Sequence, residues 1–209
     1  MRLRREILSR RQQAVLARLC ALLDPSPFYL AGGTALALQL GHRRSVDLDW
    51  FCNAALPDPL RLAAELRDSG IGLRSVTTER GTLHATFGGV RVSFLEYRYR
   101  LLRPLLRDAS SRLRLASRQD LACMKLAAVA QRGSKKDFVD IFALGQRLTL
   151  RDMLAAYRRK YEVEDIGHVL YALSYFDDAD AERMPVMLRP WTWVQIKTTI
   201  GRWVRDCAR

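Results

Sequence analysis

The chain has 209 residues, a length that fits one domain with an extension or two small domains. Its composition, 49% hydrophobic and 27% charged, is that of a soluble globular protein. Lys and Arg outnumber Asp and Glu by 35 to 22, and the net charge of +13 favours polyanionic partners such as nucleic acid, nucleotides or anionic membrane surfaces. A basic surface that serves only solubility would give the same charge. No apolar run approaches the ~20 residues needed to span a bilayer, so no membrane partner is expected.

The cysteines and the N-terminus indicate the compartment. The four cysteines are widely spaced and include no CxxC pair, which excludes a disulfide framework and a zinc site and predicts a reducing cytoplasm. The basic N-terminal stretch has Arg18 within its apolar part and no A-x-A cleavage site after it. This pattern predicts an amphipathic first helix rather than a signal peptide.

Strand and helix patterns alternate over the first hundred residues. A turn at residues 24–27 ends the first helix, and FYLAGG then predicts a short strand that stops at two glycines. TALALQLG predicts a second helix, GHRRS a loop, VDLDWF a strand and DPLRLAAELRDSG a third helix. Three strand-like runs follow, IGLRSVTTE, TLHATFGG and VRVSFLEYRY, with a glycine hairpin between the last two.

From about residue 101 the pattern changes. RPLLRDASSRLRLAS is loop-like, and LACMKLAAVAQ and KKDFVDIFALGQR then predict helices, with further helical segments around 150–160 and 165–176. PWTWVQIKTTIGRWVRDC predicts a closing amphipathic helix whose tryptophans pack on the core. We therefore expect an α+β fold, with a mixed sheet and flanking helices over residues 1–100 and a helical domain over residues 101–209.

An acidic pair lies in the strand VDLDWF. Alternate side chains of a strand share a face, so Asp47 and Asp49 are expected to point the same way about 7 Å apart, with Val46, Leu48 and Trp50 directed into a core. Two neighbouring carboxylates repel each other unless a cation lies between them, and magnesium suits such oxygen ligands. Because Mg²⁺ completes its shell with water and phosphate, the pair predicts phosphoryl or nucleotidyl transfer. The alternative is an edge strand with an acidic solvent face.

Residues upstream of the acidic pair suit a phosphate. Gly32 and Gly33 lie between a strand and a helix, where backbone N–H groups and the helix N-terminus favour an anion, and Thr34 can add a hydroxyl. A plain tight turn would also use two glycines. Arg43 and Arg44 occupy the loop before the acidic strand and either contact a triphosphate or belong to a solvated loop.

The stretch GGTALALQLGHRRSVDLDWF resembles the motif of polymerase β-like nucleotidyltransferases and, more closely, the AbiEii/AbiGii toxins of type IV toxin–antitoxin systems. That branch has a second motif in a helical C-terminal part, which KLAAVAQRGSKKDFVD matches with Lys125, Arg132, Lys136, Asp137 and Asp140. The resemblance implies a polymerase β-like core and Mg²⁺-dependent transfer of NMP from an NTP to an RNA acceptor such as tRNA. It also implies a cognate antitoxin as partner.

The second motif has its own physical interpretation. Lys125 is the only charge within LACMKLAAVA, so its ammonium needs either an anionic partner, such as a nucleotide phosphate or the acids at 137 and 140, or a route to water along its stem. Asp137 and Asp140 share a helix face. The resemblance implies catalytic roles for Lys125 and both acids and nucleotide binding by Arg132 and Lys136. Capping and surface pairing are the alternative for these side chains.

Polymerase β-like transferases usually carry a third acid on a neighbouring strand, and the expected position in VRVSFLEY holds Ser93. Glu96 is our candidate, although it would lie on the opposite strand face from Ser93 unless a bulge intervenes. A surface acid at the strand end is the alternative. If no third acid exists, we expect either weak activity or a base borrowed from elsewhere, such as Asp137 or Asp140. His84 lacks metal-ligand spacing and is interpreted as structural.

Two functions of other classes stay open. A catalytically weak or inactive nucleotide- or RNA-binding module would keep the phosphate-binding turn at Gly32 and Gly33 and the basic surface. The presence of Ser93 in place of an acid favours this module over an enzyme. An interaction protein whose activity needs, or is silenced by, a cognate antitoxin would also fit the sequence.

Overall fold

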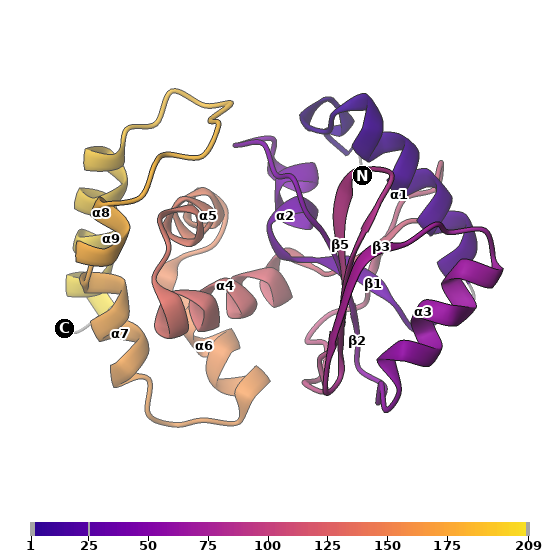
Figure 1. Ribbon diagram of the computed structural model, residues 1–209. Helices are drawn as coiled ribbons and strands as arrows, with labels where there is room; N and C mark the ends of the chain where they lie inside the picture. The colour runs from indigo at the N-terminus through magenta and orange to yellow at the C-terminus, as the bar shows by residue number, and fades with distance from the viewer. Residues whose placement is uncertain (1–2, 25, 208–209) are drawn as a thin grey trace. The chain divides into compact units, whose positions relative to one another are not determined.

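The computed structural model describes residues 3–24 and 26–207, so Pro25 in the predicted turn lies outside the described residues. The described chain forms two compact units. The core unit takes residues up to Gln39, Ser45–Arg100 and Pro104–Ala116, and the helical unit takes Leu40–Arg44, Leu101–Arg103 and the chain from Ser117 onward. Figure 1 shows the elements of both units.

The core unit is built on a mixed sheet with the strand order β3-β4-β5-β2-β1-β7-β6. Strand β2 runs parallel to β5, β1 runs parallel to β7, and the other neighbours are antiparallel. The strands are β1 Tyr29–Ala31, β2 Leu48–Cys52, β3 Arg74–Glu79, β4 Thr82–Phe87, β5 Val90–Glu96, β6 Leu106–Arg107 and β7 Arg114–Leu115. The stretch predicted as a loop after residue 101 thus contains β6 and β7, which at two residues each are too short to show a periodic pattern.

Helices α1 and α3 pack against one face of this sheet (Figure 1). The first element is the short 3₁₀ helix η1 (Arg5–Ile7), and α1 (Arg10–Leu23) then begins with a capping box in which Ser9 and Gln12 bond to each other's backbone N–H. Asp58 caps α3 (Pro59–Asp68) with its carboxylate. Both helices were predicted from the sequence, and both bury an apolar side.

The strand β2 alternates between buried and half-buried residues. Leu48 and Trp50 are buried, as predicted, whereas Asp49 is on the half-buried face. Val46 was expected in the core, but its exposed fraction is 61%. The reason is that the strand begins at Leu48, so the period-two alternation does not extend back to Val46.

The helical unit contains the second half of the chain. Its helices are α4 Arg118–Arg132, α5 Lys135–Gly145, α6 Leu150–Tyr161, α7 Gly167–Ser174, α8 Asp177–Asp180 and α9 Trp193–Cys207. Helix α4 contacts α5, α6 and α7, and α9 contacts the same three helices. Figure 1 shows these helices. Trp193 contacts Phe138, and Trp203 stacks on Phe142 with ring centroids 5.9 Å apart. The predicted closing helix and the packing of its tryptophans are confirmed.

Among residues 3–24 and 26–207, no helix has both the length and the apolar character required to cross a membrane.

Candidate functional site

The turn from β1 into α2 (Gly32–Leu40) brings glycine backbone against the acidic strand. Gly32 has φ of +67°, a left-handed conformation that glycine adopts without steric cost. A Cβ atom added to Gly32 would lie 2.9 Å from Oδ2 of Asp49. The antiparallel register of β1 and β2, which pairs Ala31 with Asp49, causes this close approach. The Asp49 carboxylate therefore lies at the beginning of α2.

Asp47 reaches the same helix start through its backbone. The buried hydroxyl of Thr34, in the first turn of α2, donates a hydrogen bond to the carbonyl oxygen of Asp47. The Thr34 hydroxyl thereby fixes the segment that precedes β2, so Thr34 positions Asp47 in this structure. Both acids of the pair are thus placed at the N-terminal end of α2, one by its main chain and one by its side chain.

The Asp47 side chain also has a cationic neighbour. Its Oδ1 accepts a hydrogen bond from Nε of Arg91 at 2.7 Å, and the exposed fractions of the two side chains are 30% and 72%. Exposed ion pairs of this kind contribute about 0–1 kcal/mol. A bound cation would therefore displace the Arg91 side chain from Asp47 at little cost in free energy.

The donor set at this corner suits a magnesium ion. The two carboxylates of Asp47 and Asp49 are hard oxygen ligands, and the glycine at 32 leaves the space beside Asp49 without a side chain. No cluster of three or more His, Cys, Asp or Glu side chains placed for a metal occurs in the described part of the chain. Since Mg²⁺ typically takes only one or two protein carboxylates and completes its shell with water and phosphate, the residues fit this ion.

The neighbouring strand β5 places Ser93 beside Asp49. In the parallel register of β2 and β5, Asp49 pairs with Ser93, and both residues lie on the half-buried face of the sheet. The Oγ atom of Ser93 is 3.1 Å from Nδ1 of His84 on β4. The sequence favours a structural role for His84 and gives no sign of this contact. The alternation of TLHATF does place His84 on the outward face, but the register that brings it to Ser93 is not visible in the sequence.

Glu96 does not converge with the acidic pair, and the prediction that it is the third acid needs correction. The regular register of β2 and β5 pairs Glu96 with Cys52, on the opposite sheet face from Asp49 and Ser93, and no bulge interrupts it. The Glu96 carboxylate accepts a hydrogen bond from the Leu56 N–H at 2.7 Å and pairs with Arg98. The Leu56 hydrogen bond, followed by Arg98, lowers the pKa of Glu96.

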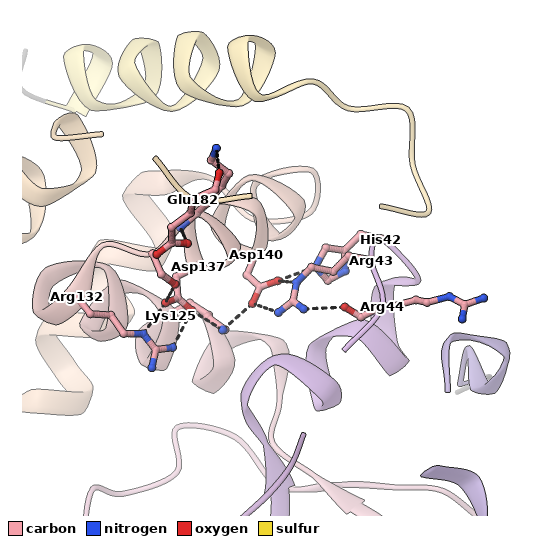
Figure 2. Close-up of polar contacts among 10 residues, drawn as sticks. His42, Arg43, Arg44, Lys125, Arg132, Asp137, Asp140 and Glu182 are labelled. Atoms are coloured by element: carbon pink, nitrogen blue, oxygen red, sulfur yellow. Dashed lines mark hydrogen bonds and ion pairs between the residues drawn. The ribbon is translucent and has the colours of Figure 1, made fainter. Parts of the chain in front are cut away.

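The residues of the second motif form a buried charge cluster in the helical unit (Figure 2). Nζ of Lys125 lies 2.7 Å from Oδ1 of Asp137 and 2.6 Å from Oδ2 of Asp140. Both carboxylates have no exposed surface, and 5% of Lys125 is exposed. Of the partners considered for Lys125, the structure thus provides the two acids.

The loop after α2 contributes to the same cluster. Arg43 binds Asp140 in a bidentate manner, through Nε at 2.7 Å and Nη2 at 2.8 Å, and Nε2 of His42 lies 2.8 Å from the same carboxylate (Figure 2). Arg43 is 4% exposed, so it is neither a solvated loop residue nor open to a ligand in this structure. The side chain of Arg44 is exposed, and its N–H donates to the carbonyl of Val186.

The other end of the cluster reaches the surface. Arg132 donates to Asp137 through Nε at 2.8 Å, and 56% of its side chain is exposed. Lys136 is exposed on α5, whereas its neighbour Lys135 is buried and donates to the carbonyl of Glu182. Arg132 and Lys136 are therefore open to an anionic ligand.

The cluster is held in its ionised form. Burial by itself raises the pKa of Asp140, but Lys125 and Arg43 outweigh it and hold that pKa well below its usual range. Burial likewise opposes the lowered pKa of Asp137 and the raised pKa of Lys125, and in both cases the opposite charges of the cluster prevail. Buried carboxylates with lowered pKa values are poor proton acceptors, so the arrangement disfavours Asp137 or Asp140 as the missing base.

Comparison with known proteins gives consistent matches. A family model described as "Nucleotidyl transferase AbiEii toxin, Type IV TA system" matches residues 14–192. An uncharacterized protein of Aquifex aeolicus (strain VF5) is 33% identical over 202 residues, which cover 95% of this chain and 97% of that protein.

Solved structures share the fold. A putative nucleotidyltransferase from H. pylori superimposes with a TM-score of 0.58 at 15% identity, covering 95% of both chains. MenT4, a nucleotidyltransferase toxin from Mycobacterium tuberculosis H37Rv, superimposes with a TM-score of 0.55 at 19% identity, covering 92% of this chain and 82% of that chain. The predicted α+β fold with a nucleotidyltransferase core is confirmed.

Proposed function

The chain belongs to the AbiEii family of nucleotidyltransferase toxins of type IV toxin–antitoxin systems, and we propose that it transfers NMP from an NTP to a hydroxyl of an RNA acceptor, such as tRNA, with Mg²⁺ as cofactor. The observation that carries this proposal is the contact geometry between Gly32 and Asp49, where a Cβ would come within 2.9 Å of the carboxylate. It supports the proposal because a backbone turn that would bind phosphate lies beside a carboxylate that would bind the metal ion.

The N-terminus of α2 is the proposed triphosphate site. The N–H groups of Gly32 and Gly33 start a helix, where free donors and the helix dipole favour an anion, and neither residue has a side chain that would keep phosphate away. Asp47 and Asp49 would hold the magnesium ion. When bound, Mg²⁺ would offset the charge of the phosphates and of the departing pyrophosphate.

We assign the buried cluster a supporting role rather than a catalytic one. Lys125, Asp137 and Asp140 satisfy one another inside the helical unit, and an ammonium that is paired with two carboxylates is not available to a phosphate. Arg132 and Lys136, which are exposed, are the proposed contacts of this motif with nucleotide or RNA phosphates.

Charge and family support the proposed partners. The net charge of +13 attracts a polyanionic acceptor, and it therefore favours RNA over an uncharged acceptor. Type IV toxins imply a cognate antitoxin, which we propose as the protein partner. Free cysteines, found at all four positions, fit a reducing cytoplasm.

The alternative is a nucleotide- or RNA-binding module without catalysis. The observation that favours it is Ser93, a residue with no carboxylate, at the position beside Asp49.

The test is label transfer. The protein is incubated with Mg²⁺, each labelled NTP in turn and total tRNA, and transfer is followed by gel electrophoresis of the RNA. Asp49→Ala is expected to lower transfer at least 100-fold, within the range for loss of a group that stabilises transition-state charge. Asp68→Ala, an exposed acid at the end of α3, is the matched control and should keep the wild-type rate.

Each outcome has a clear meaning. Transfer that Asp49→Ala abolishes and Asp68→Ala preserves supports the enzyme. NTP binding by the wild-type protein with no transfer to any RNA supports the binding module. Wild-type rates in Asp49→Ala would contradict the proposed site.

A further inference from the structure

A row of polar side chains crosses strands β2, β5 and β4 on the half-buried face of the core sheet, the face that carries Asp49. Asp49 on β2 pairs with Ser93 on β5, and Ser93 pairs with His84 on β4. Residues paired across neighbouring strands present their side chains on the same face. The row therefore starts at the acid that faces Gly32 and ends at an imidazole.

The step from Ser93 to His84 is short enough for proton transfer. Nδ1 of His84 lies 3.1 Å from Oγ of Ser93, which is within hydrogen-bond distance. Because neighbouring strands lie about 4.8 Å apart, the backbones of His84 and Asp49 are separated by two strand spacings, about 10 Å, across the sheet. Ser93 occupies the place between them. His84 itself is exposed and needs no rearrangement of the core to exchange protons with solvent.

The transfer reaction needs a group that removes a proton from the attacking hydroxyl. Glu96 lies on the opposite sheet face, and Asp137 and Asp140 are buried against Lys125. Imidazole is the side chain best suited to accept a proton near neutral pH, because it titrates between pH 5 and 8.

We propose that His84 accepts the proton of the acceptor hydroxyl, relayed by Ser93; this inference rests on the proposed function. The acceptor oxygen forms a bond to the α-phosphorus of the NTP as its proton passes to Oγ of Ser93. Ser93 gives its own hydroxyl proton to Nδ1 of His84. The bond between the α-phosphorus and the bridging oxygen breaks, and its electron pair leaves with pyrophosphate. His84 then releases the proton to solvent.

Other charged groups lie on the same sheet face as His84, and their contribution to proton transfer must be distinguished from that of His84. Arg91 on β5 and Glu79 on β3 lie on the same sheet face, and Thr77 is the direct β3 neighbour of His84. Arg91 cannot accept a proton at neutral pH, whereas Glu79 is a carboxylate and therefore the competing base. Glu79→Gln is included among the variants for that reason.

The experiment measures kcat and KM of Mg²⁺-dependent transfer from pH 5 to 9. His84→Gln and Ser93→Ala are each expected to lower kcat about 10²- to 10⁴-fold with little change in KM for the NTP, and the acidic limb of the kcat profile should disappear in His84→Gln. The double variant should be no slower than His84→Gln, because the two residues act as one unit. Glu79→Gln and His168→Gln, which removes another exposed histidine, should match the wild-type profile.

A second variant separates proton transfer from structure. Ser93→Asp in the His84→Gln background places a carboxylate beside Asp49. The kcat of this double variant is expected to be at least tenfold higher than that of His84→Gln. A structural role for the His84–Ser93 pair predicts no such rescue and no change in the pH profile.

The outcomes distinguish this inference from the function on which it rests. A wild-type pH profile in His84→Gln, with Asp49→Ala inactive, overturns the relay and leaves the proposed function intact. Loss of NTP binding in His84→Gln, measured by equilibrium binding, also overturns it, because the imidazole would then act in binding. A wild-type protein without transfer to any acceptor overturns both.

Discussion

Replacing Asp140 by Asn tests whether the buried cluster stabilises the fold or takes part in chemistry. Asp140 has no exposed surface and lies within 2.6–2.8 Å of nitrogen atoms of Lys125, Arg43 and His42. Asparagine has the same shape but no charge. The substitution therefore keeps the packing and leaves two buried cations with less opposite charge around them.

The expected magnitude follows from that burial. Removing one partner of a buried ion pair typically costs 3–5 kcal/mol, because the remaining charge is left uncompensated in the interior. Since Lys125 keeps Asp137 as a partner, we expect a cost near the lower end, about 3 kcal/mol. For a chain of this size each 1 kcal/mol corresponds to roughly 2–4 °C, so the Tm should fall by about 10 °C.

The assay is thermal unfolding at pH 7 followed by circular dichroism. Asp178→Asn, an exposed acid on α8, is the control and should stay within ~0.5 kcal/mol of the wild type. Transfer activity of Asp140→Asn, measured well below its Tm, should stay within about tenfold of the wild-type rate. A variant with the wild-type Tm and no transfer would refute the supporting role and assign Asp140 to the chemistry.

Two further predictions concern the turn and the pH dependence of stability. Gly32→Ala should lower transfer at least tenfold, because its Cβ would meet Oδ2 of Asp49 at 2.9 Å in a left-handed backbone, whereas Gly72→Ala, with open space around it, should transfer normally; equal rates would contradict the close approach. The pKa of Asp140 is lowered on folding, so its contribution to the free energy of unfolding is present above the ordinary aspartate pKa of about 3.9 and is lost as the pH falls through the lowered value. The pKa of Lys125 is raised, so its contribution is present below about pH 10.4 and is lost as the pH rises through the raised value. The gap in urea midpoint between wild type and Asp140→Asn should therefore narrow below about pH 4, and a constant gap down to pH 3 would count against this account.

Much of the proposed site could be read from the amino-acid sequence, because it is local. The segment from β1 through α2 to β2 is continuous, so two glycines at a strand end and two acids after one short helix are forced to lie near each other. Helices α4, α5 and α6 and the closing helix follow from apolar periodicity, which depends only on residues three or four positions apart. The alternation within β5 likewise indicated that Glu96 and Ser93 would lie on opposite faces.

The remaining features depend on contacts between residues that are distant in the sequence, and these became visible only in the folded chain. Alternation assigns a face to His84, but only the register of β4 on β5 selects Ser93 as its neighbour. A lone lysine in an apolar helix predicts an anionic partner without identifying it, and the packing of α4 against α5 provides the two carboxylates. The burial of Arg43 is of the same kind, since a charge in a loop is expected in water until a buried acid compensates its desolvation.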